Sequence, residues 1–296
     1  MNFNMDNIKI EQPTKKRFSE DSEKQDRYLK IIEKNSILYT PKPDDFQDLY
    51  SKVEIEQDLR AVEIRKRQFK ENQTDLGLTL KKVSDVYEGV IVEQAEQNEW
   101  FGEGVSFYPT SEFDDIVNGV DGVAEFTPDD DVSDEYLALS FDVVFSTDPK
   151  RILKKLERTK MEIKEGRLTE VKYFEDAKGT KKSIKAPRLV LGSRLTSAEK
   201  LIDLWGGSDK NKNKKLAQHP VQIKLLLESY LQLNHFAHFA HKIGEIDISV
   251  AYTVLGNRIA KILNSEKQEL MTEVFQEVSD DIVFETIREY CNDVEI

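Results

Sequence analysis

An α+β fold, with a core ordered α-β-β-β-α-β and a mixed sheet, is what the sequence predicts. Three short runs rich in β-branched and aromatic residues stand in the middle of the chain, bounded by Gly, Pro, Asp and Ser: 104–111, 119–126 and 136–146. Helical periodicity prevails before and after them. We therefore expect an N-terminal helical arm, an α/β core and a C-terminal helical bundle, over 1–77, 78–207 and 208–296.

The first part of the chain is predicted to be helical with one extended linker. Helices are expected over 19–35 and 48–72, and the two prolines in 39–46 disfavour a helix between them. The helix expected over 78–101 opens the core. Four apolar residues share one of its faces: Val83, Val86, Val90 and Ala95.

In the second half of the core, residues typical of helix ends mark where helices begin and stop. A helix over 147–166 can be capped by Thr147 or Asp148, has Pro149 in its first turn and ends at Gly166. Strands are expected over 168–175 and 187–193. A capping box, Thr196 and Glu199, opens the next helix. The Lys/Asn-rich stretch 208–218 is expected to be a linker or mobile loop, and four helices follow it.

The bulk composition restricts the class of protein. The 296-residue chain carries a formal net charge of −13, which argues against a protein that coats nucleic acid with a basic surface. Its one cysteine, Cys291, rules out a disulfide framework and suits a reducing compartment. The first residues lack the apolar stretch of a signal peptide, and there is no apolar run long enough for a membrane span. We expect a soluble cytoplasmic protein.

Two aspartates stand inside strand-like runs. If 119–126 and 136–146 pair as an antiparallel hairpin with Phe126 opposite Leu137, then Asp121 lies directly across from Asp142. Opposed side chains have Cβ atoms about 4.5–5.5 Å apart, and like charges there are destabilising. A cation must compensate, or one carboxylate must hold a proton.

The charges are segregated along the chain. There is no Lys or Arg between Val83 and Pro149, whereas 150–188 holds fourteen Lys and Arg against six Asp and Glu. An acidic cluster followed by a basic segment suits a site in which a divalent cation binds the carboxylates and the bases hold a polyanion. We therefore expect DNA or RNA to bind through 150–188.

The residues over 80–193 resemble the PD-(D/E)xK nuclease superfamily, which has restriction-endonuclease-like folds. The resemblance implies that Asp121 is the first aspartate of the motif and Asp142 its second acid. The family often adds a glutamate from the first core helix, a position for Glu93 or Glu88, and Asp115 is a further possible ligand. The cofactor it implies is Mg²⁺ or Mn²⁺, held by these carboxylates.

The chain departs from the family's pattern at two positions. Val120 replaces the family's proline, which is common and harmless, and Val144 stands where the family places a lysine that helps to activate water. Some members supply this group from elsewhere. The expected substitutes are Lys160 or Lys164 on the following helix, or Lys172 on the following strand. Two functions stay open: a metal-dependent nuclease that hydrolyses DNA or RNA, and an inactive scaffold of the same fold that binds nucleic acid or protein.

Overall fold

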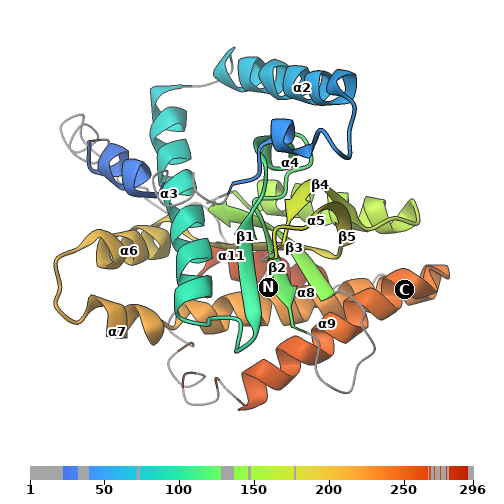
Figure 1. The fold of residues 1–296 in the computed structure, drawn as a ribbon. Helices are drawn as coiled ribbons and strands as arrows, with labels where there is room; N and C mark the ends of the chain where they lie inside the picture. Colours follow the sequence, from blue (N-terminus) through green and yellow to red (C-terminus); the bar gives the residue numbers. More distant parts are fainter. Residues whose placement is uncertain are drawn as a thin grey trace.

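The computed structural model of the chain describes most of the sequence (Figure 1). The described residues are 23–32, 40–71, 74–127, 137–145, 148–176, 178–265 and 280–292, with the single residues 267, 270, 274 and 278. Helices flank a mixed β-sheet, so the predicted α+β class is confirmed. Among the described residues, no helix is both long and apolar enough to cross a membrane.

The central sheet has four strands in the order β1-β2-β3-β6: Val105–Pro109, Gly122–Phe126, Leu137–Phe145 and Arg188–Ser193. β1, β2 and β3 pair antiparallel, and β6 pairs parallel to β3. Phe126 pairs with Leu137, which confirms the predicted register. The alternation of side chains across the strands sets this register, because a slip by one residue would expose the buried face.

Helices precede and interrupt the sheet strands. α3 (Asp75–Gln97) comes before β1, short α4 (Glu112–Ile116) lies between β1 and β2, and α5 (Pro149–Lys164) follows β3. Asp148 caps α5, since its side chain accepts the N–H of Lys150 at 3.0 Å. The order along the sheet-forming chain is therefore α-β-β-β-α-β, with α4 and one hairpin as insertions.

The hairpin corrects the prediction for the end of the core. β4 (Thr169–Glu175) does not join the central sheet but pairs with β5 (Lys181–Ala186), a strand that was not predicted. β5 reads KKSIKA, too rich in lysine to indicate a strand. It forms one because Ile184 and Ala186 point inward and are buried, while the lysines stay at the surface.

Two predicted linkers are helical. Residues 43–46 form the 3-10 helix η1 (Pro43–Phe46), whose Phe46 is fully buried. The stretch 208–218, expected to be a mobile loop, contains α7 (Lys212–Ala217). Leu216 of α7 is buried, and its carbonyl oxygen accepts the indole N–H of Trp100 at 3.1 Å. Neither helix could be predicted from its local sequence, because each has few apolar residues and these pack against distant parts of the chain.

The remaining helices cover the sheet and frame its edge. They are α2 (Lys52–Glu71), α6 (Leu195–Gly206), α8 (Val221–Ile243), α9 (Ile246–Ser265) and α11 (Ile282–Asn292). Three of the four expected C-terminal helices thus occur, and most of the third, 265–278, lies outside the described residues. One hydrophobic core runs from α3 through the sheet into α8, α9 and α11, across the boundary expected at 207/208. Figure 1 shows α2 crossing the top of the molecule and α8 and α9 below the sheet.

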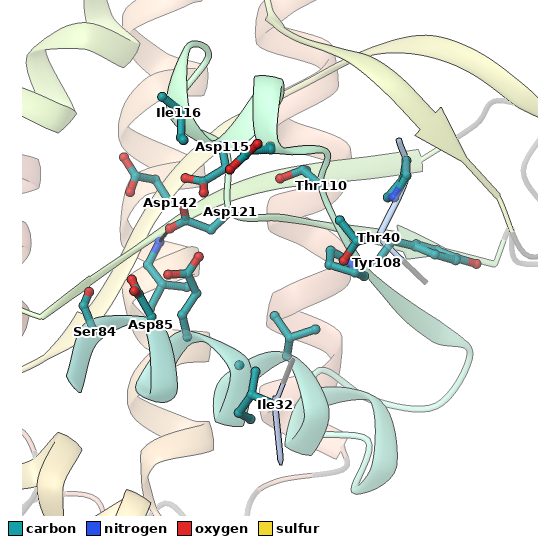
Figure 2. Close-up of a pocket in the computed structure, with 18 of the residues that line it drawn as sticks. Ile32, Thr40, Ser84, Asp85, Tyr108, Thr110, Asp115, Ile116, Asp121 and Asp142 are labelled. Atoms are coloured by element: carbon teal, nitrogen blue, oxygen red, sulfur yellow. Dashed lines mark hydrogen bonds between the residues drawn. The ribbon is translucent and has the colours of Figure 1, made fainter. Parts of the chain in front are cut away.

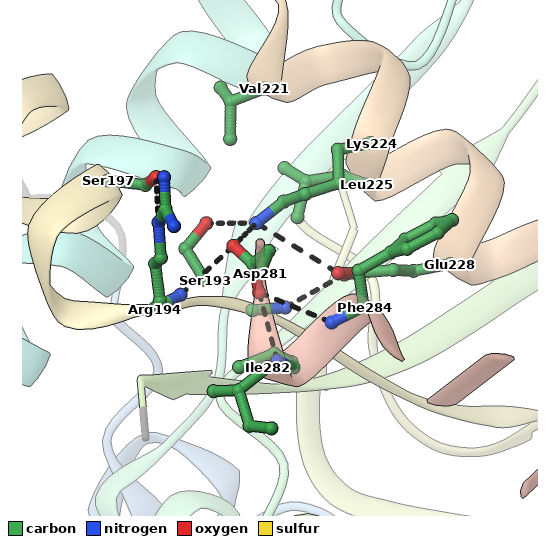
Figure 3. Close-up of polar contacts among 12 residues, drawn as sticks. Ser193, Arg194, Ser197, Val221, Lys224, Leu225, Glu228, Asp281, Ile282 and Phe284 are labelled. Atoms are coloured by element: carbon green, nitrogen blue, oxygen red, sulfur yellow. Dashed lines mark hydrogen bonds and ion pairs between the residues drawn. The ribbon is translucent and has the colours of Figure 1, made fainter. Parts of the chain in front are cut away.

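A buried polar network joins α8 to β6 and to the start of α11 (Figure 3). The Lys224 ammonium, fully buried, donates to Asp281 at 2.7 Å and to the hydroxyl of Ser193. Glu228, one turn further along α8, accepts the N–H of Gly192 at 2.9 Å. Buried charges are tolerated only with such partners. The network therefore fixes the position of α8 against the end of β6.

We predict that Glu228→Gln stabilises the protein at high pH. Burial raises the pKa of Glu228 to about 8, against the lowering by Lys224. Because this pKa lies above the unfolded value, the stability that the protonated carboxyl contributes is lost as the pH rises through about 8. The melting temperature of the variant should exceed that of wild type by about 2 °C or more at about pH 9, and the difference should disappear at about pH 4, where the carboxyl is protonated in both states. Exposed Glu289→Gln is the control. An equal difference at both pH values would contradict the prediction.

Candidate active site

A cavity of ≈ 2570 Å³ opens at the edge of the sheet where β2 and β3 carry the two aspartates. α3 forms one wall, α4 and the end of β1 another, and the first turns of α5 a third, while the last turns of α2 reach its rim. Figure 2 shows Asp115, Asp121 and Asp142 together on one side, with Asp85 of α3 on the other. Acidic side chains therefore gather on two facing sides of the cavity.

Asp121 and Asp142 lie side by side, as the register predicts. Asp121 directly precedes β2, and its backbone N–H donates to the carbonyl oxygen of Phe141 at 2.9 Å. Its carboxylate accepts the N–H of Val143 at 2.5 Å. Asp142 on β3 is only 6% exposed. Gly122 follows Asp121 because the Phe141 ring fills the space where a side chain would be: an added Cβ would lie 2.3 Å from that ring.

A buried arginine holds the turn that leads into Asp121. Arg188 of β6 donates to the carbonyl oxygens of Asn118 at 2.7 Å and Gly119 at 2.8 Å. The same guanidinium pairs with Glu162 of α5 at 3.3 Å. Gly119 has a positive φ of 61°, which a side chain would strain. Arg188 therefore ties the loop before Asp121 to the helix on the other side of the site.

That helix supplies a cation which the sequence analysis missed. Lys155 of α5 forms an ion pair with Asp142. Burial lowers the pKa of Lys155, but the charges of Asp142 and Asp121 outweigh it and raise the pKa above its usual value. Lys155 is thus an ammonium at neutral pH. The sequence carried only part of the signal: the apolar stripe of Ile152 and Leu156 places Lys155 near the sheet, but no local pattern identifies Asp142 as its partner.

Further carboxylates from two helices share the cavity. Burial, and then the charges of Asp121 and Asp115, raise the pKa of Glu88 on α3 well above its usual value. The pKa of Asp115 on α4 rises to about 6 because the cavity desolvates it and Asp85 lies near, although Lys81 and a hydrogen bond with Asp121 lower it. Carboxylates that repel one another in this way have a strong affinity for protons or for a cation.

Of the other residues that the sequence proposed, Glu93 stays in the cavity and Lys160 lies away from the aspartates. Glu93 lines the same cavity, five residues beyond Glu88 on α3, and accepts the indole N–H of Trp205 at 2.8 Å. Lys160 lies with its ammonium 5.4 Å from the centre of the Phe239 ring.

The remaining two lysines also lie apart from the aspartates. Lys172 pairs with Asp58 of α2 at 2.5 Å and sits over the ring of Tyr50. Lys164 is the exposed last residue of α5. Of the basic residues near the aspartate pair, it is Lys155 that makes the contact, and none of the three predicted lysines does so in the described part of the chain.

The donor set suits a hard divalent cation, although its atoms are not drawn together. Every acidic group of the site offers oxygen, the ligand that Mg²⁺ and Mn²⁺ prefer. Among the described residues, no three His, Cys, Asp or Glu side chains are close enough to form a ready coordination sphere. The hydrogen bond between Asp115 and Asp121 indicates two carboxylates close enough to share a positive charge.

Comparison of the chain with protein-family models, with curated proteins and with solved structures finds no match. The functional argument therefore rests on the geometry of the cavity and the order of the elements around it.

We predict opposite effects of two isosteric changes on metal-free stability. Burial, then Asp142 and Asp115, raise the pKa of Asp121 well above its usual value, so ionised Asp121 destabilises the fold increasingly as the pH rises. Asp121→Asn should therefore raise the melting temperature in EDTA, more at about pH 8 than at about pH 5. Asp142→Asn should lower it, because Lys155 loses its ion-pair partner. A lower melting temperature for Asp121→Asn at the higher pH would contradict this assignment.

Proposed function

We propose that this protein is a metal-dependent nuclease with a PD-(D/E)xK-type site that hydrolyses phosphodiester bonds of DNA or RNA. The observation that carries the proposal is the contact between Lys155 and Asp142, next to Asp121. Two acids and one lysine are the groups that the motif requires, and Lys155 supplies from α5 what Val144 on β3 cannot.

The order of the elements supports the same proposal. The sheet-forming chain runs α-β-β-β-α-β, with three antiparallel strands followed by a parallel fourth, and the two aspartates stand at the start of β2 and within β3. The resemblance stated from the sequence implies this core. The α4 and β4–β5 insertions lie outside this core, so they do not disturb the placement of Asp121 and Asp142.

The carboxylates of Asp121 and Asp142 would hold the metal ion, with Glu88 and Asp115 as the nearest additional oxygen donors. A bound Mg²⁺ or Mn²⁺ lowers the pKa of a water ligand and neutralises charge on a phosphate. The fit follows from the donor set, because the carboxylates of these four residues line one cavity, and their mutual charges add to burial in raising the pKa of Asp121 and Glu88.

Lys155 acts as a hydrogen-bond donor in this proposal. Its raised pKa keeps the ammonium protonated at neutral pH, so it orients the attacking water or a phosphate oxygen instead of removing a proton. A carboxylate of the cavity that does not hold the ion, such as Asp115 if Asp121 and Asp142 alone hold it, would accept the proton released by the attacking water. Arg151 and Lys154, on the same rim of the cavity, would hold the phosphates on either side.

We predict that Lys155→Ala and Asp142→Ala each lower the rate of metal-dependent cleavage about a hundredfold or more. Single- and double-stranded DNA and RNA should each be tested, with Mg²⁺ and with Mn²⁺. Lys160→Ala, a change on the same helix that leaves the aspartates untouched, should keep the rate close to that of wild type. Circular dichroism of each variant checks that the fold persists.

The alternative function would be visible in the same assay. A wild-type protein that cleaves none of these substrates with either metal, yet binds nucleic acid, would be the inactive scaffold and not the nuclease. Equal losses of cleavage rate for Lys155→Ala and Lys160→Ala would instead contradict the role assigned to Lys155.

We further predict that millimolar Mg²⁺ or Mn²⁺ raises the melting temperature, because a ligand that binds only the folded state stabilises it. Asp121→Asn should weaken this response, since it removes one ionised ligand and part of the repulsion that the cation relieves. Asp85→Asn, on the far wall and paired with Lys81, is the matched control and should leave most of the response. No shift in the wild type would count against a metal site here.

A further inference from the structure

We propose that the nucleic acid taken by this cavity is single-stranded, and that Phe69 of α2 stacks on one of its bases. The proposal rests on the proposed function of the cavity and specifies its substrate. It is carried by the side chains on the rim of the cavity, away from the aspartates.

Cations line the rim on two separate helices. Arg151 and Lys154 come from α5, next to Lys155, and Arg65 and Lys70 come from the last turns of α2. Within the part of the chain that the structure describes, these four exposed side chains make no hydrogen bond or ion pair. Four other bases that line the cavity are paired with acids, in the pairs Lys66–Glu112, Lys81–Asp85, Lys155–Asp142 and Arg158–Glu162, and Lys42 and Lys178 line it as well. Two sets of unpaired cations therefore face the same cavity, as a polyanion that passes from one helix to the other requires.

Phe69 stands between the cations of α2. It lies one turn after Arg65 and next to Lys70, lines the cavity, and is 55% exposed. An exposed aromatic ring among cations is the arrangement by which proteins stack unpaired bases while holding the phosphates. In a duplex, both faces of each internal base are covered by neighbouring bases, so the ring would have nothing to stack on. Phe69 therefore favours a single strand.

The position of α2 and the size of the cavity agree with an extended ligand. Pairs between Lys66 and Glu112 and between Lys172 and Asp58 hold α2 against α4 and β4. The ring of Phe69 is thus carried on a fixed element. The cavity of ≈ 2570 Å³ is larger than the roughly 300–1,000 Å³ of sites for small molecules. It continues from Asp142 to α2, which gives room for several linked nucleotides.

Binding can be measured apart from cleavage. We would use fluorescence anisotropy with a labelled oligonucleotide of mixed sequence, as DNA and as RNA, alone and annealed to its complement. Ca²⁺ replaces Mg²⁺, EDTA serves as a second condition, and a gel checks that the oligonucleotide stays intact. We expect the single strand to bind about tenfold or more tightly than the duplex.

Phe69→Ala should weaken binding of the single strand about tenfold, the effect of losing one stacked base, and should leave duplex binding unchanged. Phe69→Tyr should retain binding, because it retains a ring. Ile64→Ala is the matched control: Ile64 is also 55% exposed on α2 but does not line the cavity. Equal loss for Phe69→Ala and Ile64→Ala would overturn the stacking role.

Salt dependence tests the cations. Arg65→Gln and Lys70→Gln should each reduce the slope of log K against log [salt] by about 0.7, the value for one phosphate contact with a single strand. Arg60→Gln, on the same helix and paired with Glu56, should leave the slope unchanged.

The two proposals fail separately. Tight single-strand binding that depends on Phe69, without cleavage in Mg²⁺ or Mn²⁺, would end the nuclease proposal and keep the substrate inference. Cleavage of duplex and single strand at equal rates, with Phe69→Ala as active as wild type, would end the substrate inference and keep the nuclease proposal.

Discussion

The repulsion between two carboxylates held across a hairpin is the constraint on which the site depends. The pairing of β2 with β3 places Asp121 beside Asp142, and both are largely removed from solvent. Backbone alternation fixes that position, so neither side chain can turn away without loss of the hairpin register. The ammonium of Lys155 compensates one of the two charges. Glu88 and Asp115 add two further carboxyl groups to the cavity. A cation that binds there would therefore be stabilised.

The sequence predicts a structural feature when residues close together in the chain determine it. It does not predict features that depend on contacts between residues far apart in the chain. The hairpin register and the meeting of Asp121 with Asp142 follow from a period of two residues, a local rule. Lys155 was not found, because its role depends on which way α5 is turned against β3. The helicity of 212–217 was missed for a similar reason, since Leu216 is held by Trp100 far away in sequence. Contacts of this kind leave no local pattern.

The cations of the molecule divide into structural and available groups. Lys172 holds α2 through Asp58, Lys224 holds α8 through Asp281, and Arg188 holds the loop before Asp121. Each of these three side chains is at least half-buried. A charge in such a low-dielectric setting needs its partner. The bases on the rim of the cavity are exposed instead. A net charge of −13 therefore coexists with a local basic surface, which bulk composition alone does not show.

Arg188 also has a consequence for how the protein is made. It joins β6 to the carbonyl group of Gly119, 69 residues earlier, and to Glu162 of α5. A ribosome releases the acidic hairpin well before it releases Arg188, so a nascent chain carries Asp121 next to a loop that Arg188 does not yet hold. Such long-range contacts form late in folding. The emerging polypeptide would thus gain its shaped acidic cavity only after β6 has been synthesised and the central sheet is complete.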